Sequence, residues 1–226
     1  MAKTYSIAID GPAGAGKSTI AKRLAKELGY KYVDTGAIYR TVAYFLDLLG
    51  VSPKDVDGVE RYIDELTVVI EYDDDGVQHM IMNGMDVSGE IRTQDISQKA
   101  SLVSAHAVVR EVLLDMQRDV AKSYNVIMDG RDIGTVVLPN ADVKIFLTAS
   151  AEVRAKRRTD ELLAKGQTAD YETVLKEIVQ RDYQDTHRPI APLKMAKESV
   201  KVDTSDMDIE QVVQTIREIV GKKIPL

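Results

Sequence analysis

Nine consecutive residues organise this chain: Gly11-Pro12-Ala13-Gly14-Ala15-Gly16-Lys17-Ser18-Thr19. They match G-x-x-x-x-G-K-[ST], a loop pattern whose backbone N–H groups cradle phosphates. A short apolar run at 6–10 precedes the loop, and apolar residues at helical spacing follow it as far as Gly29. The order of strand, glycine-rich loop and helix predicts a phosphate-binding loop with a helix N-terminus aimed at the anion.

Two side chains of the loop indicate the chemistry. Lys17 is placed to reach the β- and γ-phosphates of a nucleoside triphosphate, and the Ser18 hydroxyl is placed to hold Mg²⁺. We therefore expect ATP and Mg²⁺ as cofactors, with Lys17 catalytic. The residues expected to bind ATP are those of the loop itself: Gly11, Pro12, Ala13, Gly14, Ala15, Gly16, Lys17, Ser18 and Thr19.

The composition narrows the class of protein. The 226 residues suffice for one α/β domain with a small insert, and the absence of cysteine excludes disulfides and cysteine-ligated metals. The net charge of −6 argues against a nucleic-acid binder. The N-terminus has no signal-like apolar region, and no run approaches the roughly 20 apolar residues of a membrane span. We expect a cytoplasmic monomer without membrane or nucleic-acid partners.

Short apolar runs alternate with helical patterns along most of the chain. The strand patterns are at 6–10, 31–34, 125–129, 143–147 and 200–203, and the helical patterns are at 20–28, 42–49, about 55–65, 95–120 and 209–220. This alternation predicts a P-loop NTPase fold, with a five-stranded parallel sheet covered by helices on both faces. Ser205 and Asp208 are spaced as a capping box for the last helix, and Gly221 stands at its end.

Ligands of such sheets bind beyond the carboxyl ends of the strands. Asp10, Asp34 and Asp129 each end a predicted strand. We expect Asp129, together with Ser18, to hold Mg²⁺.

One region breaks the α/β pattern. Strand-like runs at 67–72, 77–82 and 85–87 are separated by an Asp-rich turn and by Asn83-Gly84, a strong hairpin signal. We predict an antiparallel β insert over 67–92 in a kinase core made of 1–66 and 93–226. Asp73–Gly76 fits the D-x-x-G pattern of GTPases, but the chain has no N-K-x-D, so we interpret it as a turn.

Arginines concentrate in the second half. Arg154, Arg157 and Arg158 share one helical face by their spacing, and Arg181 and Arg188 follow on the next helix or just beyond it. A solvated helix face is the plainer interpretation of such a run. Beside a triphosphate site, however, the arginines indicate a mobile lid over about 154–170, because phosphoryl transfer needs charge neutralisation and exclusion of water. We expect Arg154 and Arg157 to bind ATP and Arg158 to be catalytic.

Longer motifs make a family resemblance specific. They are Ile9–Pro12 with the phosphate loop, Asp34-Thr35-Gly36-Ala37-Ile38-Tyr39-Arg40, Asp86–Thr93, Asp129-Gly130-Arg131-Asp132-Ile133-Gly134-Thr135-Val136-Val137, and Arg181-Asp182 through Asp185 to Arg188. With these motifs the chain resembles the bacterial cytidylate kinases, which are P-loop nucleoside monophosphate kinases. Thr35 stands where the family more often has Ser.

The resemblance implies the acceptor and the residues that bind it. The reaction would be ATP + CMP or dCMP → ADP + CDP or dCDP. Arg40, Arg131 and Arg181 would hold the acceptor phosphate or its neighbourhood, with Arg131 also catalytic, and Asp185 would hold the sugar. The base would be read by Thr35, Ser101, Arg110, Asp132 and Arg188.

Two other functions stay open at this point. A P-loop kinase could act on UMP, AMP or a sugar acid instead, and a nucleotide-dependent switch would use the same loop without transfer. The phosphate loop does not distinguish among these, because it reads only the donor.

Overall fold

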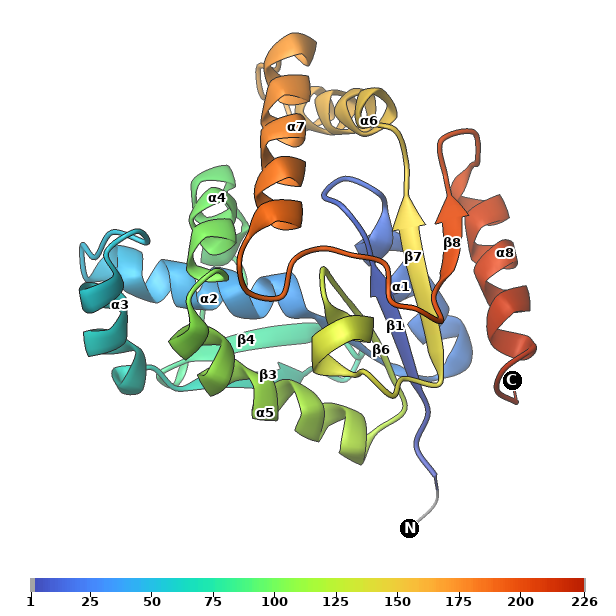
Figure 1. Cartoon of the computed structure of the whole chain (residues 1–226), viewed down its shortest axis with the longest axis horizontal. Coiled ribbons are helices and arrows are strands. Elements are labelled where there is room, and N and C mark those ends of the chain that lie inside the picture. The colour runs from blue at the N-terminus through green and yellow to red at the C-terminus, as the bar shows by residue number, and fades with distance from the viewer. Residues whose placement is uncertain (1–2, 226) are drawn as a thin grey trace.

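The computed structural model describes residues 3–225, so the outermost residues of the predicted core, 1, 2 and 226, lie outside it. Its main sheet is parallel and five-stranded, in the order β2-β6-β1-β7-β8 (Figure 1). The strands are β1 (Ser6–Asp10), β2 (Lys31–Asp34), β6 (Val126–Gly130), β7 (Val143–Thr148) and β8 (Val200–Asp203). The predicted fold class is confirmed.

Side chains that alternate along the strands feed two separate cores. Ile7 and Ile9 point to one face, where they pack with α1 (Lys17–Leu28) and α8 (Ile209–Gly221). Ala8 and Met128 point to the other face, which is covered by α2 (Thr35–Leu48) and α5 (Ala107–Ser123). Helices therefore cover both faces, as a parallel sheet requires.

The predicted meander is a second, antiparallel sheet of β3 (Val68–Tyr72), β4 (Gln78–Met82) and β5 (Met85–Asp86). Asp73–Gly76 forms a turn between β3 and β4, closed by a bond from the Gly76 N–H to the Asp73 carbonyl. The Gln78 side chain joins this sheet to the core: it accepts from the Asp34 N–H (2.7 Å) and donates to the Asp34 carbonyl (3.3 Å). The division into core and insert stays a prediction.

Several helix boundaries differ from those predicted. The helix expected at 42–49 begins seven residues earlier, at Thr35, because the Asp34 carboxylate caps it by accepting from the Ala37 N–H (2.9 Å). The helical pattern of 95–120 is two helices, α4 (Gln94–Val103) and α5, with a break at Ser104–His106. The segment expected at about 55–65 is α3 (Val56–Tyr62) followed by η1 (Ile63–Glu65).

The cap of the last helix also differs. Asp208 is the N-cap of α8, and its capping-box partner is Gln211 instead of Ser205. Ser205 instead accepts from the Ser150 N–H, and Gly221 is the last residue of the helix. The spacing rule was matched to the wrong pair because Ser205 and Asp208 also lie three residues apart.

Two helices stand beyond the carboxyl ends of the strands (Figure 1). They are α6 (Ala151–Ala164) and α7 (Tyr171–His187), which pack on each other through a small core of their own containing Ala155, Leu162, Val174 and Ile178. Short 3₁₀ and π segments, η2 (Glu90–Arg92) and η3 (Ile133–Val137), complete the fold. Over residues 3–225, no helix has the length and apolar character needed to cross a bilayer.

Candidate active site

A cavity of about 850 Å³ opens at the carboxyl end of the main sheet, between the phosphate loop and α2, α4 and α7. Its lining includes fourteen of the predicted site residues: Ala13, Gly14, Lys17, Ser18, Thr35, Arg40, Ser101, Asp129, Arg131, Asp132, Arg158, Arg181, Asp185 and Arg188. The parallel register places the strand ends together, since Ile9 pairs with Asp129 and Asp129 with Asp34. One cavity thus joins the donor and acceptor residues.

The phosphate loop has the backbone geometry of an anion cradle. Gly14 and Gly16 have φ values of +75° and +86°, a region that favours glycine. Gly11 is packed so closely on β7 that a Cβ would lie 1.9 Å from the Leu147 carbonyl oxygen. Each of these positions therefore requires glycine for a backbone reason.

The ammonium of Lys17 is buried inside this loop, where it donates to the Pro12 carbonyl (2.7 Å). Burial, together with the nearby charge of Arg131, lowers the Lys17 pKa to about 7. An anionic oxygen in the cradle would favour the charged form, so phosphate binding and protonation of Lys17 support each other.

Ser18 and Asp129 meet beside Lys17. The Ser18 hydroxyl donates to Asp129 Oδ2 (2.9 Å), and the Tyr32 hydroxyl donates to Oδ1 (2.7 Å). Burial and the neighbouring Asp34 raise the Asp129 pKa, as expected for a carboxylate that lacks a full counter-charge. Within residues 3–225 no three His, Asp or Glu side chains converge on one ion position. One carboxylate and one hydroxyl are the donor set that Mg²⁺ uses when phosphate oxygens and water supply the other ligands, so these residues fit the ion.

The acceptor half of the cavity is rich in guanidinium groups. Arg131 Nε donates to Asp185 Oδ2 (2.7 Å), and Arg40 Nη2 donates to Asp34 Oδ2 (3.0 Å). Burial and the charge of Arg131 lower the Arg181 pKa to about 10. Among the described residues, the Nε atoms of Arg40 and Arg181 are buried donors without a hydrogen-bond partner. Buried donors are normally satisfied, so these two atoms point to an anionic group of a ligand.

Asp132 lines the same cavity and is almost fully buried. Arg110 contacts one carboxylate oxygen, and Arg188 Nη2 lies 3.4 Å from the other. Arg188 is held in turn by the Ser104 hydroxyl (3.0 Å). Arg110 touches Asp132 from behind and does not line the cavity itself. At this place the Asp132 carboxylate can accept hydrogen bonds from a planar ligand, and the Arg188 guanidinium can donate them.

Two predicted hydroxyls face the same space. The Thr35 hydroxyl donates to the Asp129 carbonyl (2.7 Å), and the Ser101 hydroxyl lies 3.5 Å from Asp185 Oδ1. Arg131 lowers the Asp185 pKa, although burial opposes this shift, so the Asp185 carboxylate is charged and available as an acceptor.

The three arginines of the predicted lid have different surroundings. Arg158 lines the cavity and donates to Glu161 (3.0 Å). Arg154 lies outside the lining: its guanidinium binds both oxygens of Asp182 (3.0 and 2.6 Å) and the Ala13 carbonyl (3.1 Å). Arg157 binds the hydroxyl and carbonyl of Thr204 (3.1 and 2.6 Å), also away from the lining. The phosphate-loop residues Gly11, Pro12, Ala15, Gly16 and Thr19 likewise contribute no lining surface.

Sequence reasoning missed several side chains that hold the site. Tyr32 binds Asp129, Asp34 binds Arg40, and Asp182 fixes Arg154 against the phosphate loop. Asp182 and Asp34 stood inside the quoted motifs, so their positions carried a signal, but Tyr32 lay in an ordinary strand pattern.

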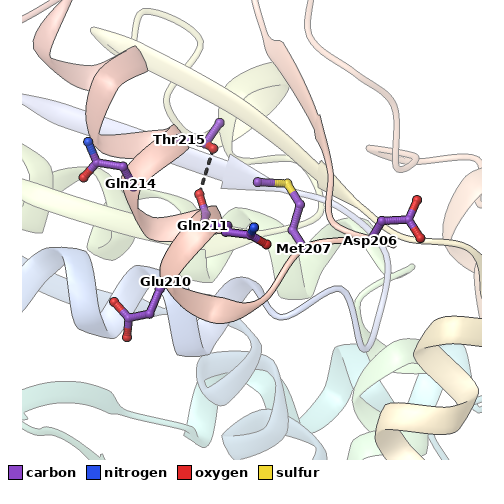
Figure 2. A pocket seen from close by; sticks show the side chains of 6 residues that line it. All are labelled: Asp206, Met207, Glu210, Gln211, Gln214 and Thr215. Carbon is purple, nitrogen blue, oxygen red and sulfur yellow. Dashed lines mark hydrogen bonds between the residues drawn. The ribbon is translucent and has the colours of Figure 1, made fainter.

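A second hollow, of about 560 Å³, lies over the first turns of α8 (Figure 2). Its side chains are Asp206, Met207, Glu210, Gln211, Gln214 and Thr215, and the Thr215 hydroxyl is turned to the Gln211 carbonyl (2.7 Å). This lining has no Lys or Arg and two carboxylates, so it does not suit a phosphate.

The fold and the first cavity, with its phosphate loop facing a guanidinium-rich acceptor region, define a P-loop kinase.

Comparison with known proteins identifies the family. The family model described as cytidylate kinase matches residues 7–222. Named relatives include the cytidylate kinases of Carboxydothermus hydrogenoformans (49% identity, covering 96% of this chain and 97% of the relative) and Clostridium tetani (45%, 96% and 94%). A third, from Geobacillus sp. strain WCH70, is 46% identical over 99% of this chain and all of its own. The chain belongs to the cytidylate kinase family, which confirms the predicted family and enzyme class.

Proposed function

We propose that this enzyme transfers the γ-phosphate of ATP to CMP or dCMP, giving ADP and CDP or dCDP. The observation that carries the proposal is that one cavity is lined by Lys17 and Ser18, by Arg40 and Arg181 with their unpartnered Nε atoms, and by Asp132. The cavity has a volume of about 850 Å³, and relatives of this chain carry the name of this activity.

The acceptor chemistry explains why the site needs no general base. A phosphate monoester is already anionic at pH 7, so its oxygen attacks without loss of a proton. Catalysis then consists of positioning and charge stabilisation, by Lys17 on the donor side and by Arg131 and Arg158 near the transferred group. Ser18 and Asp129 would hold Mg²⁺, which when bound neutralises charge on the phosphate oxygens.

The cytosine base fits the Asp132 end of the cavity. Cytosine presents an amino donor beside two acceptors, which complement a carboxylate flanked by guanidinium groups. Arg110 and Arg188 both contact Asp132, so that carboxylate keeps one orientation toward the base. Uracil reverses the donor and acceptor at two of the corresponding atoms. It would leave buried polar groups unpaired, at roughly 1–3 kcal/mol each.

A panel of acceptors tests the proposal. ADP release is measured with Mg²⁺ and ATP against CMP, dCMP, UMP, AMP and gluconate. We expect CMP and dCMP to be the best acceptors, UMP to react measurably but more slowly, and EDTA to stop turnover. Faster reaction of UMP than of CMP would make the base assignments wrong. ATP binding without transfer to any of the five would instead support a switch.

We propose a lid over about 154–170 and a core of 1–66 and 93–226 with the insert 67–92. We also propose Arg154 and Arg157 as ATP-binding residues, supported by the bond from Arg154 to the Ala13 carbonyl. We also propose a monomer, which sedimentation of the purified enzyme would test, and a cytoplasmic location, where ATP is available as the donor.

A further inference from the structure

The chain that carries Arg131 and Asp132 continues directly into η3, a turn of π-helix. The Val137 N–H donates to the Asp132 carbonyl (3.2 Å), and the Leu138 N–H donates to the Ile133 carbonyl (2.7 Å), each across five residues. Such segments are rare and are frequent at functional sites. Since Asp132 supplies the first carbonyl of η3, the shape of this turn sets the direction of the Asp132 side chain.

Asp10 holds the first turn of η3. Its carboxylate accepts from the N–H groups of Ile133 and Gly134, both at 2.7 Å, and only 2% of the residue is exposed. The contact is close enough that a Cβ on Gly134 would lie 3.2 Å from Asp10 Oδ2. Asp10 is also the residue immediately before Gly11, so its backbone is continuous with the phosphate loop.

Arg118 holds the other end of the same turn. From α5, its Nη2 donates to the Val136 carbonyl and its Nε to the Val137 carbonyl, both at 3.0 Å. One turn further on, Lys144 of β7 donates to the Pro139 carbonyl (2.5 Å). Three charged side chains from three elements thus satisfy backbone groups of one short segment, and none of the three lines the cavity.

We propose that Asp10 and Arg118 are positioning residues for acceptor recognition, and that they act by fixing η3 and hence the Asp132 carboxylate. The inference rests on the proposed function, because it assigns Asp132 to the base. Asp10 sets how far the Asp132 carboxylate lies from the phosphate loop. Its side chain is hydrogen-bonded to η3, which follows Asp132, and its backbone ends β1, which leads into the phosphate loop. Arg118 keeps the turn from relaxing toward an ordinary helix, since it occupies the carbonyls that end it.

Arg118→Met is the principal test, because Arg118 is only half-buried and its loss leaves the core intact. We expect the KM for CMP to rise about tenfold or more and the preference for CMP over UMP to fall by a similar factor, while the KM for ATP changes less than about twofold. Arg118→Lys retains one charged donor group and should recover part of the preference. A merely structural residue would weaken CMP and UMP alike.

Asp10→Asn supplies an independent variant from the other end of η3. One carboxylate oxygen becomes an amide donor that faces a backbone N–H, so the same loss of CMP preference is expected. The matched control is Asp142→Asn, since Asp142 also accepts a backbone N–H, from Ser6 (2.9 Å), at the opposite end of β1. This control should leave the preference and both KM values unchanged.

Three outcomes would overturn the inference. They are an unchanged CMP-to-UMP preference in Arg118→Met, equal losses for CMP and ATP, and loss of cooperative unfolding in both Arg118 variants. If Asp10→Asn does not fold, the Arg118 pair decides alone. The acceptor panel with the wild-type enzyme tests the proposed function separately from the role of Asp10 and Arg118. If the wild type preferred another nucleotide to CMP, the proposed function would be wrong. The Arg118 variants would then be compared for their preference between that nucleotide and the next best acceptor.

Discussion

Lys17→Ala lowers kcat by roughly 10²–10³ or more while the protein stays folded, the largest effect on turnover that we expect. Its ammonium lies inside the phosphate loop, where, among residues 3–225, its one hydrogen bond is to the Pro12 carbonyl. Removing it deletes charge stabilisation at the transferred phosphoryl group and frees one carbonyl that water can reach through the cavity. Steady-state kinetics with saturating ATP and CMP measures the change.

Lys26→Ala is the matched control for this prediction. Lys26 lies on the same helix, α1, with its side chain exposed and outside the cavity lining. Its replacement should leave kcat unchanged and the melting temperature of the two alanine variants similar. A Lys17→Ala enzyme that kept most of its turnover would remove Lys17 from the mechanism.

Asp132→Ala has the largest expected effect on acceptor choice. It leaves Arg110 and Arg188 without their shared carboxylate and removes the group that we propose as the acceptor for the cytosine amino group. We expect the preference for CMP over UMP to fall about 10- to 100-fold and the KM for ATP to stay within about threefold, because the donor loop is not touched. Competition assays with the two nucleotides give the preference directly.

The same substitution also has a stability cost that must be measured beside it. Breaking a buried ion pair from one side costs about 3–5 kcal/mol, since the remaining charge loses its partner. Asp119→Ala, which breaks the exposed pair of Asp119 with Lys122 on α5, should cost less than about 1 kcal/mol and leave the kinetics unchanged. Equal losses of CMP and ATP affinity in Asp132→Ala would contradict its assignment to the base.

The sheet could be predicted well because its signals are local. The central strands β1, β6 and β7 are short apolar runs because they are buried on both faces, and all five strands were found with boundaries close to those observed. The hairpin at Asn83-Gly84 was equally predictable, because its turn needs two residues with positive φ and Asn-Gly is the pair that most readily adopts it. Both residues have positive φ in the structure.

The missed features depend on partners distant in sequence. The early start of α2 comes from its Asp34 cap, which is itself held by Gln78 of the insert, 44 residues away. The π turn at 133–137 is hydrogen-bonded to the side chains of Asp10 and Arg118, and neither position has a periodicity that marks it. Pattern reasoning is blind to such bonds, since it sees only spacing along the chain.

The candidate site divides in the same way. The residue types at the phosphate loop and at the strand ends pointed to one cavity, and the cavity lining includes Lys17, Ser18 and Asp129. Spacing alone placed Arg154, Arg157 and Arg158 on one helical face, but their guanidinium groups have three different sets of partners. A helix turn of about 100° per residue is too coarse to tell which long side chain reaches which neighbour.

The pairing of arginines with internal carboxylates in the acceptor region has a consequence for affinity. Asp34, Asp132 and Asp185 are paired with Arg40, Arg188 and Arg131, so these carboxylates offset part of the repulsion among the cations before a nucleotide arrives. An incoming dianion must compete with these counter-ions, so its binding combines an exchange of partners with new contacts to the unpartnered Nε atoms of Arg40 and Arg181. Because these charges are already paired inside the protein, dissolved salt screens them little. We therefore expect the affinity for the nucleotide to depend only weakly on ionic strength, although the site holds many charged groups.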